Sequence, residues 1–280
     1  MKIIKKIIND KNKIIIYKKN NKILVDKIFS DKNIKYLKNE ILGYKYFGKK
    51  NYFNTPKLYS YSLNKKPRKI VMEYIKGEKV SIFDFNSIYK NKINLKKKIS
   101  ITKHILNLKK KYNMKKAKNI INKTFNSLNR KQSYIFISPN HGDLVHYNCL
   151  KKNNDIYIFD LEKFSQTITP FDALNWFVHP ITLNIRKMFF INSKNYFSIA
   201  INKFILFFFF FIIKKITGNI FLNLNINKKN FYIYLKLYIL EKILIIEQDL
   251  KLVKNKNKKL IAREHIEILK YINQNINCYS

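Results

Sequence analysis

Cysteine is scarce in this sequence. Among 280 residues there are two, Cys149 and Cys278, which lie far apart and follow no paired spacing. A disulfide framework needs several pairs of cysteines, and a zinc site needs clustered cysteine or histidine ligands. The sequence therefore argues against both, and we expect a chain that works in a reducing cytoplasm.

Arginine is also rare, although the chain is strongly basic. Only four of the 57 basic residues are arginine, and 17 acidic residues leave a formal net charge of +40. The abundant lysine is accompanied by asparagine, isoleucine, phenylalanine and tyrosine, whose codons are rich in adenine and thymine, which indicates drift in base composition. Nucleic-acid binders rely on arginine for bidentate contacts, so no specific nucleic-acid partner is expected. Weak attraction to anionic membranes still follows from the charge.

Apolar runs long enough to cross a membrane are missing. The most hydrophobic stretch, FILFFFFFII at residues 204–213, has lysines on both sides. A helix of that length extends about 15 Å, half of the hydrocarbon core of a bilayer. We expect a buried helix here, with membrane insertion as the alternative. The first residues, MKIIKKIIND, lack the uninterrupted apolar segment of a signal peptide.

The N-terminal part has the pattern of a small antiparallel sheet. Over the first 30 residues, short β-branched runs alternate with asparagine-containing turns, which predicts a three-stranded meander. From Asp31, a candidate N-cap, the pattern becomes helical. The apolar positions at helical spacing are Ile34, Leu37, Ile41, Leu42 and Tyr44. Two further strands are predicted at residues 56–63 and 69–75.

The rest of the chain is mainly helical in pattern. Amphipathic helices are predicted at about residues 92–113 and 117–129, short strands and loops at residues 134–162, and helices again from Phe171. The longest of these helices, at residues 231–253, is apolar around most of its circumference but is interrupted by Lys236, Glu241 and Lys242, which favours burial against protein over lipid.

This order of elements predicts an α+β fold with two lobes. Residues 1–75 would form a small antiparallel-sheet lobe with one helix, and residues 76–280 a larger, mainly helical lobe.

The acidic residues are distributed unevenly. None occurs between Asp84 and Asp143 or between Asp172 and Glu241. Yet residues 143–172 contain five of the 17 acids, where an even spread would place about two. Drift that removed acids elsewhere has left these, so negative charge is needed in this segment.

The spacing of these residues fits phosphoryl transfer. Asp143 and Asn148 are five apart on a predicted loop, HGDLVHYN, and Asp160 ends a strand-like run, DIYIFD. The reaction needs one carboxylate beside a substrate hydroxyl, and an amide oxygen and a second carboxylate facing a divalent ion, because catalysis depends on positioning and charge neutralisation. Oxygen ligands favour magnesium over zinc or iron.

These motifs resemble those of a known family. HGDLVHYN followed by IFDLE is similar to the catalytic and metal-binding motifs of the aminoglycoside phosphotransferase and choline kinase family, which has a protein-kinase-like fold. The resemblance extends over most of the chain and implies an ATP-dependent kinase that phosphorylates an alcohol group. It implies that Asp143 orients and deprotonates the acceptor hydroxyl, while Asn148 and Asp160 hold Mg²⁺ on the ATP phosphates.

The N-terminal lobe carries matching nucleotide-binding positions. Lys27, in ILVDKIF, resembles the strand lysine that binds nucleotide phosphates, and Glu40, in LKNEILGYKYF, resembles the helix glutamate that pairs with it. VMEYIKGEKV is similar to the hinge beside the adenine, where Glu73 and Tyr74 are expected to offer backbone hydrogen bonds. The resemblance therefore implies ATP and Mg²⁺ as cofactors.

Three further positions of the motifs have supporting roles. Glu162, in the form DLE, resembles the choline-kinase-like and sugar-kinase-like branches more than the antibiotic-modifying branch. Asp172 is expected to start a helix and brace the catalytic loop. His141 is expected to brace that loop through hydrogen bonds rather than to shuttle protons.

Two features depart from the family pattern. Val145 stands where the family often has His or Asn, and no glycine precedes Gly43, so the phosphate-covering loop corresponds to the turn INDKN. Together with the charge, these departures support an alternative, a non-catalytic kinase-fold protein that binds a membrane surface or a partner. For an enzyme we expect a small-molecule acceptor: a sugar or glycan hydroxyl, as in surface polysaccharide metabolism, then choline or ethanolamine, then an aminoglycoside. The sequence decides neither the acceptor nor the oligomeric state.

Overall fold

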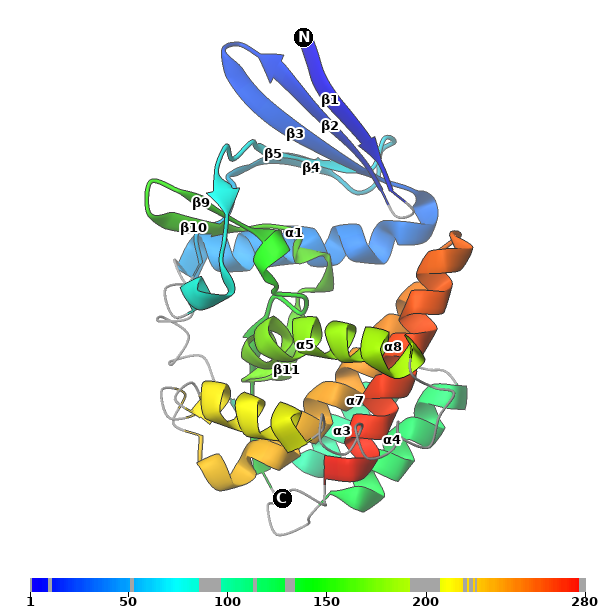
Figure 1. The fold of residues 1–280 in the computed structure, drawn as a ribbon. Helices are drawn as coiled ribbons and strands as arrows, with labels where there is room; N and C mark the ends of the chain where they lie inside the picture. Colours follow the sequence, from blue (N-terminus) through cyan, green and yellow to red (C-terminus); the bar gives the residue numbers. More distant parts are fainter. Residues whose placement is uncertain are drawn as a thin grey trace. The chain divides into compact units, whose positions relative to one another are not determined.

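A computed structural model describes most of the chain (Figure 1). The described residues are 2–9, 12–50, 53–85, 97–112, 115–128, 134–191, 207–218, 221, 224 and 226–276. They group into two compact units: unit 1 comprises Met1–Asn94 and Pro139–Thr167, and unit 2 comprises Leu95–Ser138 and Ile168–Ser280. The segment with both acidic motifs thus packs with the N-terminal residues. The lobe boundary at residue 75 stays a prediction.

Unit 1 contains a five-stranded antiparallel sheet with the order β1-β2-β3-β5-β4. Its strands are β1 (Lys2–Ile8), β2 (Asn12–Lys19), β3 (Lys22–Phe29), β4 (Leu58–Ser62) and β5 (Lys69–Glu73). Asn20 and Asn21 make the turn between β2 and β3 with φ of 47° and 57°, a left-handed conformation that asparagine tolerates. The predicted meander and the predicted strand pair are both confirmed.

Helix α1 (Ile34–Lys50) belongs to the same unit and follows a short 3-10 turn, η1 (Asp31–Asn33). The predicted helix is confirmed, but two of its details are wrong. Ser30, not Asp31, precedes the first turn, and the Asp31 carboxylate instead pairs with Arg68 and Lys66. Leu42 is 56% exposed. The stripe that α1 buries consists of Tyr36, Leu37, Glu40, Ile41, Tyr44 and Phe47.

The segment with the acidic motifs adds a second sheet to unit 1. It runs through η4 (His146–Asn148), β9 (Cys149–Lys152), β10 (Asp155–Ile158) and η5 (Leu161–Lys163). Strand β9 pairs with β10 and with the short β6 (Glu78–Lys79), which is followed by η2 (Ile82–Asp84). The chain therefore reaches Asp160 directly from a paired strand.

Unit 2 begins with β7 (Lys97–Ser100), which pairs antiparallel with β8 (Tyr134–Asn140). Helices α3 (Ile101–Lys111) and α4 (Lys115–Ser127) lie between these two strands in the sequence. The helix predicted from residue 92 is wrong at its start, because Lys97–Ser100 is a strand and the Ser100 side chain caps α3 by accepting the Lys103 N–H at 3.1 Å. Residues 92–96 lie outside the described part.

Unit 2 resumes at Ile168, the last residue of β11 (Ser165–Ile168), and is helical after it. It contains α5 (Phe171–Ile191), helical residues 207–218, η6 (Lys228–Asn230), α7 (Phe231–Leu250) and α8 (Lys256–Asn275). Asp172 lies buried in the first turn of α5, as predicted for a helix start.

Helix α7 lies in the core of unit 2 and carries buried charges. Lys236, Glu241 and Lys242 are each at most 3% exposed, and Glu241 lies 2.9 Å from the Nε2 atom of His104 on α3. Polar partners of this kind fit burial against protein. None of the helices in the described ranges combines the length and hydrophobicity needed to cross a membrane.

Candidate active site

Lys27 lies at the centre of a buried ion cluster in unit 1. Strand β3 places its ammonium group 2.8 Å from Oε2 of Glu40 on α1 and 2.5 Å from Oδ1 of Asp160. The Lys27 and Glu40 side chains are 5% and 0% exposed. Buried lysines and glutamates are stable only when they are paired, so this contact accounts for both residues.

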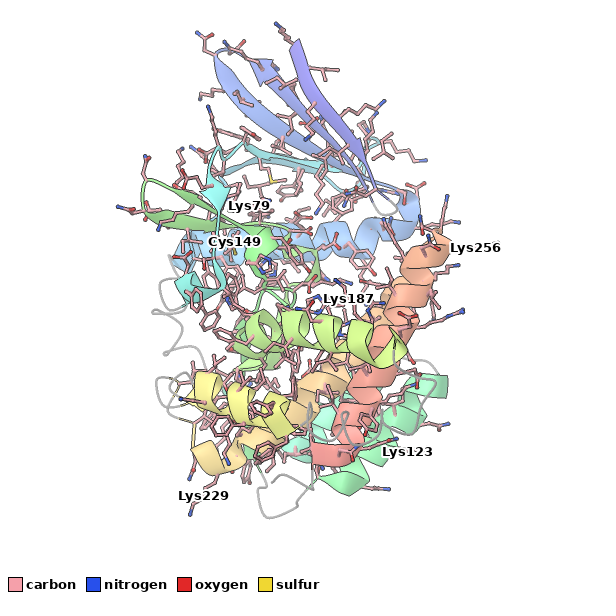
Figure 2. All side chains as sticks on the ribbon, viewed as in Figure 1. Lys79, Lys123, Cys149, Lys187, Lys229 and Lys256 are labelled. Atoms are coloured by element: carbon pink, nitrogen blue, oxygen red, sulfur yellow. The ribbon has the colours of Figure 1, made fainter. Side chains whose placement is uncertain are left out.

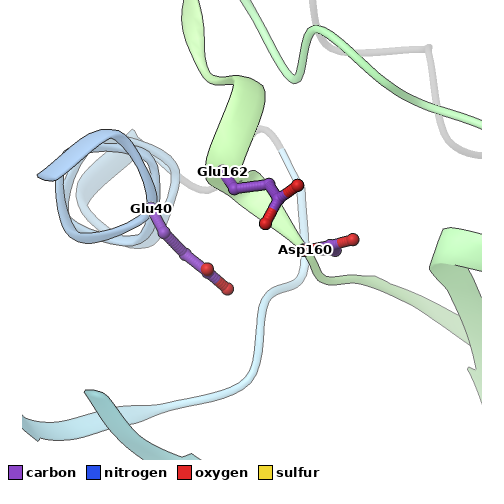
Figure 3. A group of neighbouring side chains, drawn as sticks. All are labelled: Glu40, Asp160 and Glu162. Atoms are coloured by element: carbon purple, nitrogen blue, oxygen red, sulfur yellow. The ribbon is translucent and has the colours of Figure 1, made fainter. Parts of the chain in front are cut away.

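A third carboxylate joins the cluster. Glu162, in η5, lies 3.7 Å from the Lys27 ammonium, and carboxylate oxygens of Glu40, Asp160 and Glu162 lie within 4.8 Å of one another (Figure 3). Three carboxylates thus share one lysine. The excess negative charge is the arrangement that a divalent cation would neutralise.

The pKa values within the cluster follow from burial and from this imbalance. Burial alone would lower the pKa of Lys27, but the charges of Asp160, Glu40 and Glu162 outweigh it and hold that pKa well above its ordinary value. Burial would raise the pKa of Asp160, and Lys27 outweighs it, so that pKa is lowered. Burial raises the pKa of Glu40 to about 8 despite Lys27, helped by the charges of Asp160 and Glu162. One Glu40 oxygen, Oε1, is buried without a hydrogen-bond partner among the described residues.

Close packing of α1 against η5 brings Glu40 and Glu162 together. Gly43 is the contact point, because a Cβ atom there would lie 2.8 Å from the Cβ atom of Leu161. The Asn39 side chain donates a hydrogen bond to the Glu162 carbonyl at 3.1 Å, and the rings of Phe47 and Phe164 pack edge to face at 5.4 Å. The helix therefore fixes the cluster through contacts on both sides of Glu40.

Asp160 has a left-handed backbone, with φ of 65°. Non-glycine residues in this conformation are uncommon and concentrate at functional sites. Tyr44, one turn after Glu40 on α1, hydrogen-bonds the Asp160 backbone and donates its hydroxyl to the Sδ atom of Met72 at 3.3 Å. The aspartate is thus held from its backbone and from its carboxylate.

The HGD loop is braced by the residue at its start. His141 is buried, its Nδ1 atom accepts the Asp143 N–H at 3.2 Å, and its Nε2 atom lies 2.8 Å from the Phe159 carbonyl. This pattern fits an imidazole protonated on Nε2, which donates to the carbonyl. His141 therefore ties the loop to the residue before Asp160, as the sequence predicted.

Asp143 and Asn148 are held at the two ends of the loop. The Asn148 side-chain nitrogen donates to the Asp143 carbonyl at 2.9 Å, and the Asn148 carbonyl accepts the Phe159 N–H at 3.1 Å. The charge of Asp143 also acts on the pKa of Asp160 and, after burial, raises the pKa of Tyr147. The two aspartates are therefore within electrostatic reach of each other.

Gly142 is required by the same loop. Its φ is +82°, and a Cβ atom there would lie 2.3 Å from the carbonyl oxygen of Lys163. The backbone conformation and the missing side chain both allow the loop to approach η5. These two constraints explain why the HGD motif has glycine at this position.

A cavity of about 280 Å³ opens beside the cluster. Lys27, Glu40 and Asp160 line it together with Glu73 and Tyr74. Its remaining walls are mainly apolar and include Ile14, Ile16, Val25, Met72 and Phe159. An apolar cavity with one ammonium group and an excess of carboxylates at one side fits a ligand that has an apolar part and a part held through a divalent cation.

The predicted hinge carries fewer available N–H groups than expected. Glu73 donates its N–H to the Lys57 carbonyl at 2.9 Å, and Tyr74 donates its N–H to the Ile23 carbonyl at 3.2 Å. Both donors are therefore used within the unit. Ile75 also lines the cavity, and among the described residues no backbone hydrogen bond uses its N–H.

Sequence reasoning did not single out three residues that lie at the site. Tyr44 was expected only as part of the apolar stripe of the helix, although it follows Glu40 by one turn. Asn9 and Asn12 line the cavity from the turn between β1 and β2, and their side chains hydrogen-bond at 3.3 Å. The sequence feature that pointed to Asn9 and Asn12 was the turn INDKN, which corresponds to the phosphate-covering loop of the family.

Comparisons with known proteins give matches for the structure alone. No model of a protein family matches the sequence, and no curated protein matches it. Among solved structures, the choline kinase LicA from Streptococcus pneumoniae matches with a TM-score of 0.55 and 11% identity, over 97% of this chain and 95% of that one. This chain has a protein-kinase-like fold.

Two other structures extend the match. A thermostable aminoglycoside phosphotransferase mutant, crystallised with AMP-PNP and hygromycin B, gives a TM-score of 0.59 at 8% identity over 97% of this chain and 93% of that one. An ethanolamine kinase from Plasmodium vivax gives 0.57 at 12% identity over 95% and 81%. The resemblance that the motifs indicated is therefore confirmed at the level of the protein-kinase-like fold.

Proposed function

We propose that this protein is an ATP- and magnesium-dependent phosphotransferase that phosphorylates a hydroxyl group of a small molecule or glycan. The observation that carries the proposal is the Lys27 ammonium, held between Glu40 and Asp160 in the wall of a cavity. A lysine fixed by a helix glutamate next to a metal-binding aspartate is the arrangement by which kinases hold the phosphates of ATP.

The residues present fit a magnesium ion. Asp160 and Asn148 offer carboxylate and amide oxygens, the ligand atoms that Mg²⁺ prefers. The Asn148 nitrogen is engaged by the Asp143 carbonyl, which leaves the amide oxygen for the ion. When bound, Mg²⁺ would neutralise charge on the ATP phosphates, and Asp160 would exchange part of its contact with Lys27 for the metal.

Lys27 would then bind the phosphates, with Glu40 as its orienting partner. The raised pKa keeps Lys27 charged at neutral pH. Glu40 is fully buried and contacts the ammonium directly, so it holds the lysine in one position before the nucleotide arrives. Preorganised charge of this kind lowers the barrier without rearrangement during the reaction.

For the adenine we assign the N–H contact to Ile75. The neighbouring N–H groups of Glu73 and Tyr74 already donate to Lys57 and Ile23. Glu73 and Tyr74 would contribute to the cavity wall and through their carbonyl groups. Apolar side chains such as Val25 and Met72 line the same cavity and would cover the faces of the base.

Asp143 would orient the acceptor hydroxyl and take its proton. It lies half-buried in a loop whose backbone is fixed by His141 and Asn148. Phosphoryl transfer needs such a residue chiefly for positioning, because the transition state has little bonding to the nucleophile.

For the acceptor we place a sugar or glycan hydroxyl first. The DLE form that contains Glu162 resembles the sugar-kinase-like and choline-kinase-like branches. Choline or ethanolamine is the second choice, and an aminoglycoside the third.

The proposal is tested by following label from γ-labelled ATP into three acceptor pools: sugars and surface oligosaccharides, choline with ethanolamine, and aminoglycosides. We expect magnesium-dependent transfer into one pool, highest for the glycans, and loss of transfer in Asp143→Asn. Asp155→Asn, at an exposed position at the start of β10 on the same segment, is the matched control and should transfer normally. Failure of the folded chain to bind ATP would support the non-catalytic alternative instead.

A further inference from the structure

The helix at residues 207–218 in unit 2 has two apolar sides. One side is buried and consists of Phe209, Phe210, Ile213 and Thr217, each at most 2% exposed. The other side exposes Phe207, Phe208, Phe211, Ile212 and Ile216, with exposed fractions between 38% and 57%. The prediction of a buried helix for residues 204–213 is therefore confirmed for Phe209, Phe210 and Ile213. It is wrong for Phe207, Phe208, Phe211 and Ile212, and residues 204–206 lie outside the described part.

The exposed side chains form one continuous face, which we call the aromatic face. At about 100° per residue, its five members cover roughly half of the helix circumference. Lys215 lies within the same arc and Lys214 at its edge, and both are exposed. Single exposed apolar residues are ordinary, but a contiguous group of this size marks an interaction surface.

Further positive charge adjoins the aromatic face. Lys214 lies 5.1 Å from the centre of the Tyr232 ring, and Phe210 packs against the same ring at 6.4 Å. Lys229, three residues before Tyr232, is exposed and projects away from the ribbon (Figure 2). No acidic residue occurs between Asp172 and Glu241, so no carboxylate from this part of the chain offsets these lysines.

We propose that the aromatic face docks this protein onto an anionic lipid surface, with the helix lying in the plane of the interface. Phenylalanine and isoleucine side chains would enter the boundary between headgroups and acyl chains, while the lysines contact lipid phosphates, as in other interfacial helices. Aliphatic Ile212 and Ile216 favour lipid over nucleic acid, whose bases stack on flat groups such as aromatic rings rather than on aliphatic side chains. This inference is independent of the phosphotransferase activity proposed above.

Vesicle flotation tests the proposal. The full chain should float with vesicles of phosphatidylcholine containing phosphatidylglycerol and should not float with pure phosphatidylcholine. The triple variant Phe207→Ser, Phe208→Ser, Phe211→Ser should bind the anionic vesicles at least tenfold more weakly. The matched control is Phe83→Ser, Leu106→Ser, Leu260→Ser, which removes three large apolar side chains that are 90%, 51% and 56% exposed elsewhere, and it should bind normally. Equal binding by both triple variants would overturn the proposal, because adhesion would then come from net charge alone.

A fluorescence measurement tests the proposal independently of whether the triple variant folds. The chain has one tryptophan, Trp176, which is fully buried. Phe211→Trp adds a second indole on the aromatic face, so brominated lipids should quench the variant and leave the unaltered chain unquenched. An unquenched Phe211→Trp variant on floated vesicles would also overturn the proposal, because the face would then lie outside the lipid.

Discussion

Lys27 is the residue on which the proposed site depends. Most lysines among the described residues are exposed or half-buried, yet this one is 4% exposed and lies close to three carboxylates. Desolvating a charge is costly unless partners replace the lost water. Residues from β3, α1 and the segment after β10 replace that water here.

Asp143 should affect turnover far more than nucleotide binding. Asp143→Asn keeps the shape of the side chain but removes the proton acceptor, so we expect the rate of transfer to fall by about 100-fold or more with little change in the dissociation constant of ATP. Turnover can be measured with labelled ATP, and ATP binding by calorimetry. Unchanged turnover in Asp143→Asn would remove this residue from the role of base.

Glu40 should make the stability of the ligand-free protein depend on pH. Its pKa is about 8 in the folded chain, raised mainly by burial, against a reference value of 4.5. The folded state therefore keeps a proton that the unfolded chain releases, and this stabilisation is complete below the reference value and is lost as the pH rises through about 8. We expect the free energy of unfolding to fall between about pH 5.5 and pH 8.5 more steeply in the native chain than in Glu40→Gln.

Urea denaturation at several pH values measures that difference. Glu78→Gln, at an exposed position on β6, serves as the control and should follow the native chain. Identical pH slopes for the native chain and Glu40→Gln would show that the cluster holds no such proton.

Helix α1 is the element that assembles the site in unit 1. It presents Glu40 to Lys27, Tyr44 to Asp160 and Gly43 to η5. All three lie within five positions, so a small shift of the helix would move the whole cluster.

Two glycines of this helix test its packing. Gly43→Ala places a Cβ atom 2.8 Å from Leu161 and 3.1 Å from Phe164, and we expect it to lower stability by about 1–3 kcal/mol through overpacking. Gly48→Ala has nothing within 4 Å of the added atom and should raise stability by about 0.5–1 kcal/mol through helix propensity. Thermal denaturation compares the two, and equal effects would contradict the close approach of α1 to η5.

Local patterns predicted most elements of unit 1 and fewer boundaries of unit 2. β-branched runs separated by asparagine turns identified β1, β2 and β3, and the turn between β2 and β3 has the left-handed residues that asparagine tolerates. The strand β7 was missed because Lys97–Ser100 has no alternation of its own and depends on pairing with β8, far along the chain. Such tertiary pairing overrides local propensity.

The candidate site shows the same limit. Spacing and family resemblance pointed to Lys27, Glu40, Asp143, Asn148 and Asp160, and the structure brings Lys27, Glu40 and Asp160 into contact. The role of Tyr44 could not be predicted, because it depends on the left-handed backbone of Asp160. The hydrogen bond from the Tyr74 N–H to the Ile23 carbonyl could not be predicted either, and it occupies a donor that was expected to face the adenine.

At the scale of the whole molecule, the chain shares its fold with proteins whose sequences differ widely from its own. Matches to solved kinases cover nearly the whole chain at 8–12% identity, and no family model matches. A lysine-rich surface satisfies solvation as well as a mixed one, whereas the ion cluster, the HGD loop and the core allow little change. The net charge of +40 thus describes the surface rather than the proposed chemistry.

Binding of magnesium and ATP is the most direct test of the central claim. The midpoint of thermal denaturation should be measured for the native chain, Asp160→Asn and the control Asp155→Asn, with ATP alone and with ATP and excess magnesium. A ligand at a hundred times its dissociation constant adds about 2.7 kcal/mol to the stability of the folded state. We predict a magnesium-dependent rise of several degrees in the native chain and in Asp155→Asn, and its loss in Asp160→Asn. No rise in the folded native chain, or an equal rise in Asp160→Asn, would contradict the claim that this cluster holds metal-bound ATP.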